Sequence, residues 1–233
     1  MKRALDIVLS LCGLLILSPV LLIISLLIFF YDFHSPFYVA PRVGKDGKLF
    51  RMIKFRSMVV DADSTGVTST STSDSRITPV GHFVRRCKLD EIVQLWNVLL
   101  GHMSLVGPRP NVKSGTDVYT AAERHLLSVR PGITDFASIV FADEGDILRG
   151  HADADGAYDR LIRPWKSRLG LFYIDHCSLF LDCKLIVTTI LAVVSRRSAL
   201  RIVASELSRR HAPDDLIRIS LRNEALIPCV PPL

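Results

Sequence analysis

The chain has 233 residues, enough for one membrane element and one compact domain of ordinary size, with no room for a second large domain. Its 29 Lys and Arg outnumber its 23 Asp and Glu, and the net charge of +6 favours anionic lipid heads or a phosphorylated substrate. No helix-turn-helix, zinc-finger or RNP-type pattern points to nucleic acid. The five cysteines are odd in number and lack zinc-ligand spacing, so we interpret them as reduced and structural.

The stretch from Ile7 to Phe30 carries no charged residue and is long enough to cross a bilayer once as a helix. The dipeptide Ser18-Pro19 interrupts it. Pro19 has no N–H to give to the Leu15 carbonyl, so we expect a kink there, with the Ser18 hydroxyl donating to that carbonyl instead. A straight span and a V-shaped dip that returns to the same face are both open.

Charges at the two ends of this stretch help to choose between span and dip. Basic flanks mark the cytoplasmic side of a membrane, and here both flanks are basic, which favours the dip. The flanking cations are Lys2 and Arg3 before the stretch and Arg42, Lys45, Lys48, Arg51, Lys54 and Arg56 after it. Asp6, next to Arg3, is expected to form a solvated local pair.

The remaining patterns predict a mostly helical α/β fold with one small β-hairpin. In chain order we expect a hairpin over 37–58 turning at Lys45-Asp46-Gly47, a mobile Ser- and Thr-rich loop over 61–74, a helix over 90–100 that Gly101 ends, a helix over 121–129, and helices over 161–174 and 178–194. The apolar end of the last helix, followed by several arginines, fits either the membrane surface or a buried core.

The pair Asp90-Glu91 is the first candidate for chemistry. Acids at a helix start are ordinary, because Asp caps helices well and carboxylates suit the positive end of the helix dipole. Here, however, Arg85, Arg86 and Lys88 come directly before the pair. Cations at a helix N-terminus bind phosphate, and carboxylates together with substrate phosphates hold Mg²⁺.

Four further cations could join this site. Lys54 and Arg56 alternate along the second hairpin strand, a pattern that also fits a solvated strand face. Arg109 and Arg130 each lie in a proline-stiffened turn, where an arginine loses little entropy on binding a phosphate, although such turns often only shape loops.

Several motifs resemble one family, the bacterial sugar transferases or monotopic phosphoglycosyl transferases. The matching text is the Lys2–Asp6 segment, Ser18-Pro19, KFRSM (Lys54–Met58), DSRITPVGHFVRRCKLDEIVQLWNVLLGHMSLVGPRP (Asp74–Pro110), RPGIT (Arg130–Thr134), and a weaker match in LIRPWKSRLGLFYIDHCSLFLDCKLIVTTI near the end. This covers most of the chain in the family's order.

The resemblance implies a monotopic membrane enzyme on the cytoplasmic face of the bacterial inner membrane, with a re-entrant helix broken at Ser18-Pro19 and surface amphipathic helices. Such an enzyme moves a sugar-1-phosphate from a UDP-sugar to polyprenyl (undecaprenyl) phosphate and releases UMP, the first membrane step of surface glycan synthesis. Asp90 matches the family's nucleophile, which forms a covalent phosphosugar intermediate, and Glu91 its partner at the Mg²⁺ site. Arg85 matches a phosphate-contacting arginine of the family, and Lys54, Arg56 and Arg109 match its recurring basic positions.

The expected organisation is a membrane helix over 1–36, a catalytic domain over 37–200 and an extension of unknown role over 201–233. The chain departs from the family at His102, where an acid is common, and at Asp135, where glycine is frequent. It lacks the N-terminal spans of the long forms and is expected to be the minimal catalytic unit; a homodimer is compatible with these features. The competing interpretation is a non-catalytic single-span protein with a basic binding domain.

Overall fold

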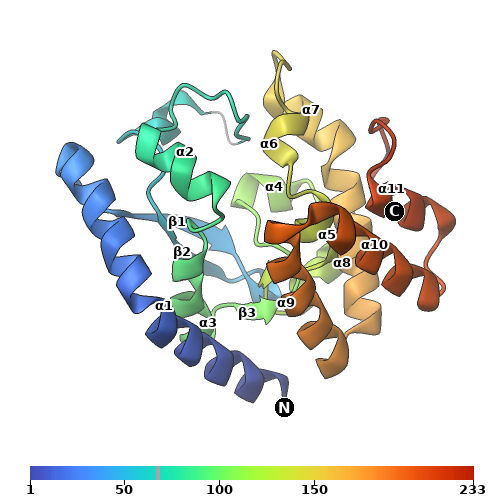
Figure 1. Ribbon diagram of the computed structural model, residues 1–233. Helices are drawn as coiled ribbons and strands as arrows, with labels where there is room; N and C mark the ends of the chain where they lie inside the picture. The colour runs from blue at the N-terminus through green and yellow to red at the C-terminus, as the bar shows by residue number, and fades with distance from the viewer. Residues whose placement is uncertain (67–68) are drawn as a thin grey trace.

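The structure is a computed structural model that describes residues 1–66 and 69–233. It is mostly helical with two small sheets, as the sequence predicts (Figure 1). The α-helices are α1 (Lys2–Asp32), α2 (Pro79–Arg86), α3 (Leu95–Leu99), α4 (Lys113–Asp117), α5 (Phe136–Val140), α6 (Glu144–Ile147), α7 (Ala154–Leu161), α8 (Arg163–His176), α9 (Leu179–Val194), α10 (Arg196–Arg209) and α11 (Asp214–Leu221). The strands are β1 (Phe37–Val43), β2 (Leu49–Phe55), β3 (Ser104–Val106) and β4 (Gly132–Thr134), and the 3₁₀ helices are η1 (Lys45–Gly47), η2 (Ala62–Thr65), η3 (Ile92–Gln94) and η4 (Glu123–Ser128).

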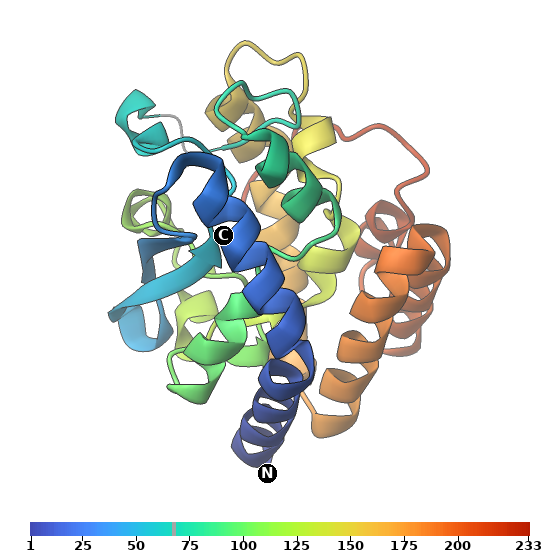
Figure 2. The same ribbon diagram turned by 60° about the vertical axis from the view of Figure 1, so that its left-hand side comes forward.

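Helix α1 contains the whole apolar stretch and continues through Ser18-Pro19 without ending. The Ser18 hydroxyl donates to the Leu15 carbonyl at 2.8 Å, which confirms the predicted replacement for the missing proline N–H. Figures 1 and 2 show the helix changing direction part-way along its length. The predicted break is therefore a bend inside one helix, because the hydroxyl bond satisfies the carbonyl that Pro19 frees.

The N-terminal end of α1 is tied to the globular domain. Lys2 Nζ lies 2.6 Å from the buried Asp182 carboxylate of α9 and 3.0 Å from the Val106 carbonyl of β3. Arg3 donates to the Val98 carbonyl of α3 at 2.6 Å. The bonds of Lys2 add to those that Tyr173 already gives to the Asp182 carboxylate and the Val106 carbonyl, so several donors converge at this attachment.

Asp6 completes this attachment, and the expectation of a solvated pair with Arg3 is wrong. Its carboxylate is buried and accepts hydrogen bonds from Ser104 Oγ at 2.9 Å and from the Leu105 N–H at 3.0 Å. A buried carboxylate needs such donors, and the start of β3 supplies them.

The C-terminal end of α1 is tied to the same domain. Arg56, just after β2, pairs with both Asp32 carboxylate oxygens at 2.5 and 2.6 Å. Ile24 and Ile28 pack with Phe55 of β2 and Val84 of α2. Helix α1 therefore lies along the outside of the domain, attached near both of its ends (Figure 2).

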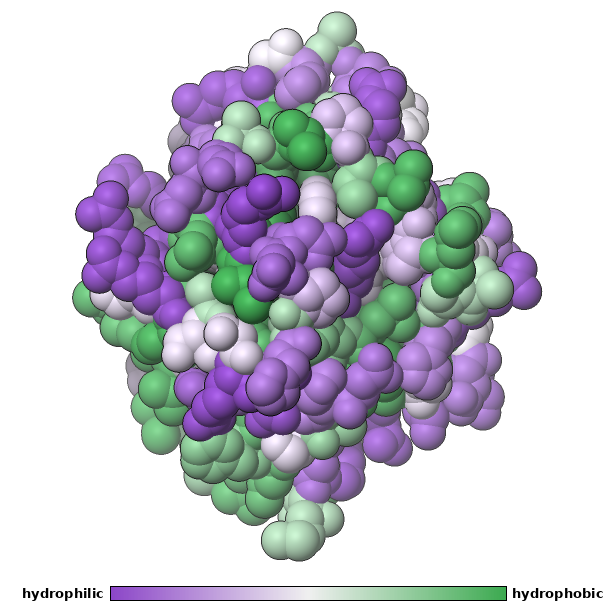
Figure 3. Space-filling view, turned by 90° about the vertical axis from the view of Figure 1, so that its right-hand side faces the viewer, coloured by the Kyte–Doolittle hydropathy of each residue, from purple (hydrophilic) through white to green (hydrophobic). Residues whose placement is uncertain are grey.

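The outward face of α1 is apolar. In its most apolar window only 11% of the residues are buried, and of the helices within the described residues it is the one long and apolar enough to cross a membrane. Leaving one such side chain in water instead of burying it costs about 1.5–3 kcal/mol. By contrast, the opposite face of the molecule is covered mainly by hydrophilic side chains, with smaller hydrophobic patches between them (Figure 3).

The predicted hairpin is confirmed. Strands β1 and β2 pair antiparallel from Phe37–Phe55 to Val43–Leu49. The buried Asn97 side chain of α3 bonds to the Arg51 carbonyl and the Ile53 N–H of β2, which fixes the hairpin against α3.

A second sheet joins the two proline-containing turns. Strands β3 and β4 pair in parallel, and each has only three residues, too few for a strand pattern. A Cβ on Gly107 would lie 2.6 Å from the Arg130 carbonyl oxygen, and one on Gly132 would lie 2.1 Å from the Gly107 nitrogen. Both glycines are needed because the two backbones touch.

Other predictions are confirmed in part. The helix expected over 90–100 begins later, with η3 and then α3, and Asp90 makes no N-cap bond, because the chain is still in a turn at Asp90-Glu91. The helix expected over 121–129 is the 3₁₀ helix η4. The loop over 61–74 holds η2, and its residues 67–68 lie outside the described residues.

The two late helices correspond to α8 and α9, and α9 is buried on one face and exposed on the other. Leu181 and Leu185 face the main core, while Phe180, Val187 and Ile190 are exposed. That core is built largely from α5, α8, α9 and α10, so the helices after residue 196 share one core with the rest of the domain.

Candidate functional site

The site begins with helix α2. Thr78 caps its first turn by accepting the Gly81 N–H at 2.9 Å, and Pro79 occupies the first helical position, where no N–H is needed. A Cβ on Gly81 would lie 1.9 Å from the Ser57 carbonyl oxygen, so only glycine allows α2 to lie against the end of the hairpin. This contact lets Arg85 Nε donate to Ser57 Oγ at 2.8 Å.

The turn at the end of α2 positions the acidic pair. The Lys88 N–H bonds to the Arg85 carbonyl at 3.0 Å and the Leu89 N–H to the Val84 carbonyl at 2.9 Å, which is a Schellman motif. Lys88 takes the left-handed conformation (φ 55°) that glycine usually supplies, and its Nζ donates to the Ala142 carbonyl at 3.0 Å.

Asp90 follows directly and is fixed by its backbone. Its carbonyl accepts the Phe55 N–H at 3.0 Å, which joins the turn to the end of β2. Its carboxylate makes no hydrogen bond or ion pair with any residue that the structure describes. Burial and the neighbouring Glu91 charge raise the pKa of Asp90, and nearby Lys54 and Arg85 oppose that rise.

Glu91 has the opposite surroundings. Both of its carboxylate oxygens pair with the Arg109 guanidinium, and Lys54 Nζ lies 3.6 Å from Oε1. Burial by itself would raise the pKa of Glu91, but Arg109 and Lys54 outweigh it and hold that pKa below its usual range. The two adjacent carboxylates therefore differ: one is held by cations and the other is left open.

The turn that carries Arg109 is positioned by the second sheet. Pro108 and Pro110 flank the arginine, and the backbone contact between Gly107 and Gly132 fixes the turn beside β4. The paired Glu91 raises the pKa of Arg109. An arginine on so rigid a support is already oriented for a phosphate, with little entropy left to lose.

The structure thus brings Lys54, Arg85 and Arg109 around the acidic pair, but gives three other predicted cations different surroundings. Each of the three guanidinium nitrogens of Arg56 donates to Asp32 or to the Ser35 carbonyl. Arg130 Nε donates to the Gly101 carbonyl at 2.9 Å, and Arg86 is exposed without a partner among the described residues. Sequence proximity could not separate these roles, because the partners come from distant segments.

The structure adds residues that sequence reasoning missed. Glu144 of α6 pairs with Lys166 of α8, and Lys166 Nζ lies 5.2 Å from the centre of the Tyr158 ring. Glu144 feels the charges of Arg109 and Lys54, and Lys166, chiefly, holds its pKa low against burial. Lys166 lies in the weaker stretch of family resemblance, but no signal marked Glu144.

The departures from the family pattern have structural roles here. Asp135 is buried, caps α5 by accepting the Ser138 N–H at 2.7 Å, and has a pKa raised by burial. The His102 ring lies 5.9 Å from the Phe50 ring. All five cysteines are free.

Asp90 and Glu91 are the residues that could hold a metal. Among the described residues no group of three His, Cys, Asp or Glu side chains forms a ready metal site. Mg²⁺ commonly uses one or two carboxylates plus substrate phosphates, so this donor set fits an ion that is bound together with a diphosphate. Glu91 uses one lone pair of each carboxylate oxygen for Arg109, so the remaining lone pairs are the ones it could offer to an ion.

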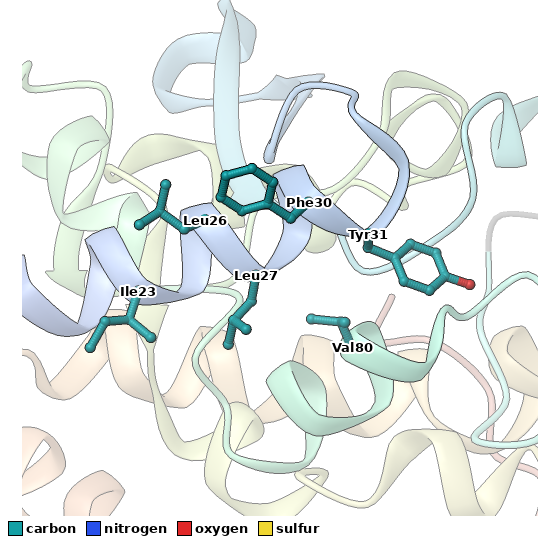
Figure 4. Close-up of a pocket in the computed structure, with 6 residues that line it drawn as sticks. All are labelled: Ile23, Leu26, Leu27, Phe30, Tyr31 and Val80. Atoms are coloured by element: carbon teal, nitrogen blue, oxygen red, sulfur yellow. The ribbon is translucent and has the colours of Figure 1, made fainter.

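An apolar hollow lies between α1 and α2. It is lined by Ile23, Leu26, Leu27, Phe30 and Tyr31 of α1 and by Val80 of α2 (Figure 4). Helix α2 also carries Arg85. A cationic site and a surface suited to hydrocarbon therefore share one helix.

Comparison with known proteins identifies the family of the chain. A family model described as bacterial sugar transferase matches residues 1–196. The chain belongs to the bacterial sugar transferase family. The match includes α1, both sheets, the acidic pair and α9, and it ends at the first residue of α10.

Three relatives illustrate the range of this transferase family. The exopolysaccharide production protein PSS of Rhizobium leguminosarum bv. phaseoli is 37% identical over 209 residues, which cover 84% of this chain and 96% of that protein. The UDP-glucose:undecaprenyl-phosphate glucose-1-phosphate transferase of Escherichia coli (strain K12) is 37% identical over 193 residues, covering 82% of this chain and 39% of the relative. The UDP-N-acetylgalactosamine-undecaprenyl-phosphate N-acetylgalactosaminephosphotransferase of Aeromonas hydrophila is 33% identical over 199 residues, 83% of this chain and 44% of the relative. The chain thus spans nearly all of the first relative and less than half of the other two.

Proposed function

We propose that this protein transfers a sugar-1-phosphate from a UDP-sugar to polyprenyl phosphate, releases UMP, and thereby begins a lipid-linked surface glycan. The observation that carries the proposal is the Asp90 carboxylate, which is open and unpaired while Lys54, Arg85 and Arg109 surround it with positive charge. The names of the relatives from E. coli and A. hydrophila support the substrate classes.

In the first step, an Asp90 carboxylate oxygen attacks the phosphorus that bears the sugar. The bond from that phosphorus to the bridging oxygen breaks, UMP leaves with the bridging oxygen, and an aspartyl phosphosugar forms. In the second step, a polyprenyl phosphate oxygen attacks the same phosphorus and Asp90 leaves as a carboxylate. Two steps allow a soluble donor and a lipid acceptor to use one site in turn.

The cations would stabilise the negative charge that develops on the transferred phosphoryl group. Arg109 offers a planar, doubly donating guanidinium, and Arg85 is oriented by Ser57, while its terminal nitrogens have no partner among the described residues. Mg²⁺, held by Asp90 and Glu91 together with the diphosphate, would neutralise phosphate oxygens when bound. The diphosphate would then replace Glu91 as the partner of Arg109.

We also propose that α1 enters the membrane from the cytoplasmic face and returns to it. Both ends of α1 are tied to one domain, through Lys2 and Asp182 at the start and through Asp32 and Arg56 at the end. A single span would have to release one of these attachments. The apolar outer face of α1 would then lie in hydrocarbon, with the acidic pair at headgroup depth.

The test is UMP release from a panel of UDP-sugars by the protein in membranes that contain undecaprenyl phosphate and Mg²⁺. We expect release with at least one sugar and ping-pong kinetics, with the two substrates reacting in separate steps. Absence of UMP release with every sugar would overturn the proposal and favour the non-catalytic binding protein. Cysteine labelling near the N-terminus distinguishes the two topologies, because a single span places that end outside the cytoplasm.

A further inference from the structure

The segment from Val140 to Glu144 connects the candidate site to the C-terminal helices. On the site side, the Ala142 carbonyl holds Lys88 Nζ at 3.0 Å, two residues before Asp90. Glu144 holds Lys166 beside the charges of Arg109. This segment, which we call the bridging segment, therefore contacts Lys88, whose charge acts on Glu91, and Lys166.

On the other side, two arginines of the C-terminal region hold the residue between these contacts. Arg196 Nη2, at the start of α10, lies 2.7 Å from the Asp143 carboxylate and donates to the Val140 carbonyl at 3.3 Å. Arg222 Nη2, at the end of α11, lies 3.5 Å from the same carboxylate. The Arg222 guanidinium also lies 5.5 Å from the centre of the buried Phe141 ring.

The Arg222 side chain is nearly buried where it contacts Asp143. Its side chain is 10% exposed, and its Nε and Nη1 atoms have no hydrogen-bond partner among the described residues. Asp143 is thus the acid that compensates its buried charge. Helix α10 packs on α9 and α11 and contributes Ala199, Leu200 and Val203 to the main core, so the arginines stand on a rigid support.

These helices are largely outside the family match, which ends at residue 196. We propose that α10 and α11 form a clamp in which Arg196 and Arg222 hold Asp143 and so position Lys88, Glu144 and Lys166 around the acidic pair. The expected effect of the clamp on the rate of UMP release rests on the proposed function. Arg196 and Arg222 act as positioning residues, since their contacts are with the bridging segment and not with Asp90 or Glu91.

The experiment compares Arg222→Ala with Arg222→Lys and with Arg218→Ala, whose arginine is exposed on the same helix and has no partner among the described residues. We expect Arg222→Ala to lower kcat for UMP release about 3- to 30-fold, with a smaller change in KM for polyprenyl phosphate. Arg222→Lys should restore part of the loss because it keeps the charge, and Arg218→Ala should match the wild type.

Hydrogen exchange supplies a readout independent of activity. In folded Arg222→Ala protein we expect faster amide exchange in peptides over 86–91 and over 140–147, with unchanged exchange in the β1–β2 hairpin. Arg196→Gln, a more exposed position, repeats the test if Arg222→Ala does not fold. Unchanged exchange and kinetics in the folded variants would overturn the clamp. If the wild type releases no UMP, the proposed function fails, while the exchange comparison still decides the clamp.

Discussion

Asp90 and Glu206 are both carboxylates among cations, and the fold treats them in opposite ways. Glu206 of α10 is 2% exposed and is held by Lys184 at 2.6 Å, Arg209 at 2.7 Å and Arg210 at 2.6 Å. Burial would raise its pKa, but these three donors lower it to about 2. Asp90 has cations nearby yet none in contact, and its pKa is raised.

The difference separates a structural acid from a reactive one. A carboxylate with every lone pair satisfied stabilises the folded state and has nothing left to offer a substrate. An open carboxylate in a partly buried site costs stability and keeps its lone pairs for a phosphorus atom or a metal ion. Glu91 lies between these two cases, because Arg109 takes one lone pair of each of its carboxylate oxygens and leaves the others.

The largest expected effect is on activity at Asp90. Asp90→Asn should reduce UMP release by a factor on the order of 10⁴ or more, because the amide cannot form the covalent intermediate. The same change should leave thermal stability unchanged or higher, because it removes a carboxylate charge that burial and the Glu91 charge disfavour in the folded protein. Activity assays and thermal unfolding of the same preparation test both, and full activity in the variant would refute the nucleophile.

The converse change at Glu206 should affect stability alone. A pKa that falls from 4.5 to about 2 on folding contributes about 3 kcal/mol. This stability is present above the unfolded pKa of 4.5 and is lost as pH falls through the folded value near 2. Denaturant unfolding should therefore show Glu206→Gln less stable than wild type at pH 7, with the gap closing in acid. Loss of specific activity in the folded variant would contradict the structural assignment.

A third test addresses the acid limb of the pH–rate profile. Because the pKa of Asp90 is raised, activity should fall with acidification at a higher pH than for an ordinary aspartate. Lys54 opposes that rise, so Lys54→Met should move the acid limb to still higher pH. The measurement is kcat/KM for UMP release against pH, and a limb that moved to lower pH would show that Lys54 does not stabilise the Asp90 carboxylate.

The smallest effect is expected at the exposed partner of Glu206. Arg209 is 58% exposed, and Lys184 and Arg210 still hold Glu206 without it. Arg209→Ala should therefore cost less than about 1 kcal/mol in denaturant unfolding at pH 7. A cost equal to that of Glu206→Gln would mean that the three cations act as one unit.

Local patterns predicted the elements that local forces determine. Charge-free apolar length predicted α1, the Lys45-Asp46-Gly47 turn predicted the hairpin, and apolar runs predicted α8 and α9. Asp90, Glu91, Lys54, Arg85 and Arg109 were also selected from charge, proline context and family resemblance, and the structure gathers them. Strands β3 and β4 were not predicted, because three residues are too few for a periodic pattern. Their pairing also depends on the backbone contact between Gly107 and Gly132.

The sequence by itself determined which residues carry charge and which segments must avoid water. The tertiary structure decided how those charges are used, because electrostatic roles depend on distances of a few ångströms between segments far apart in the chain. It assigned Arg56 to Asp32 and Arg130 to a backbone carbonyl, buried Asp6, paired Glu91 with Arg109, and left Asp90 open. Neighbouring positions with the same charge thus acquired different roles, since each role follows from the partner that folding brings within reach.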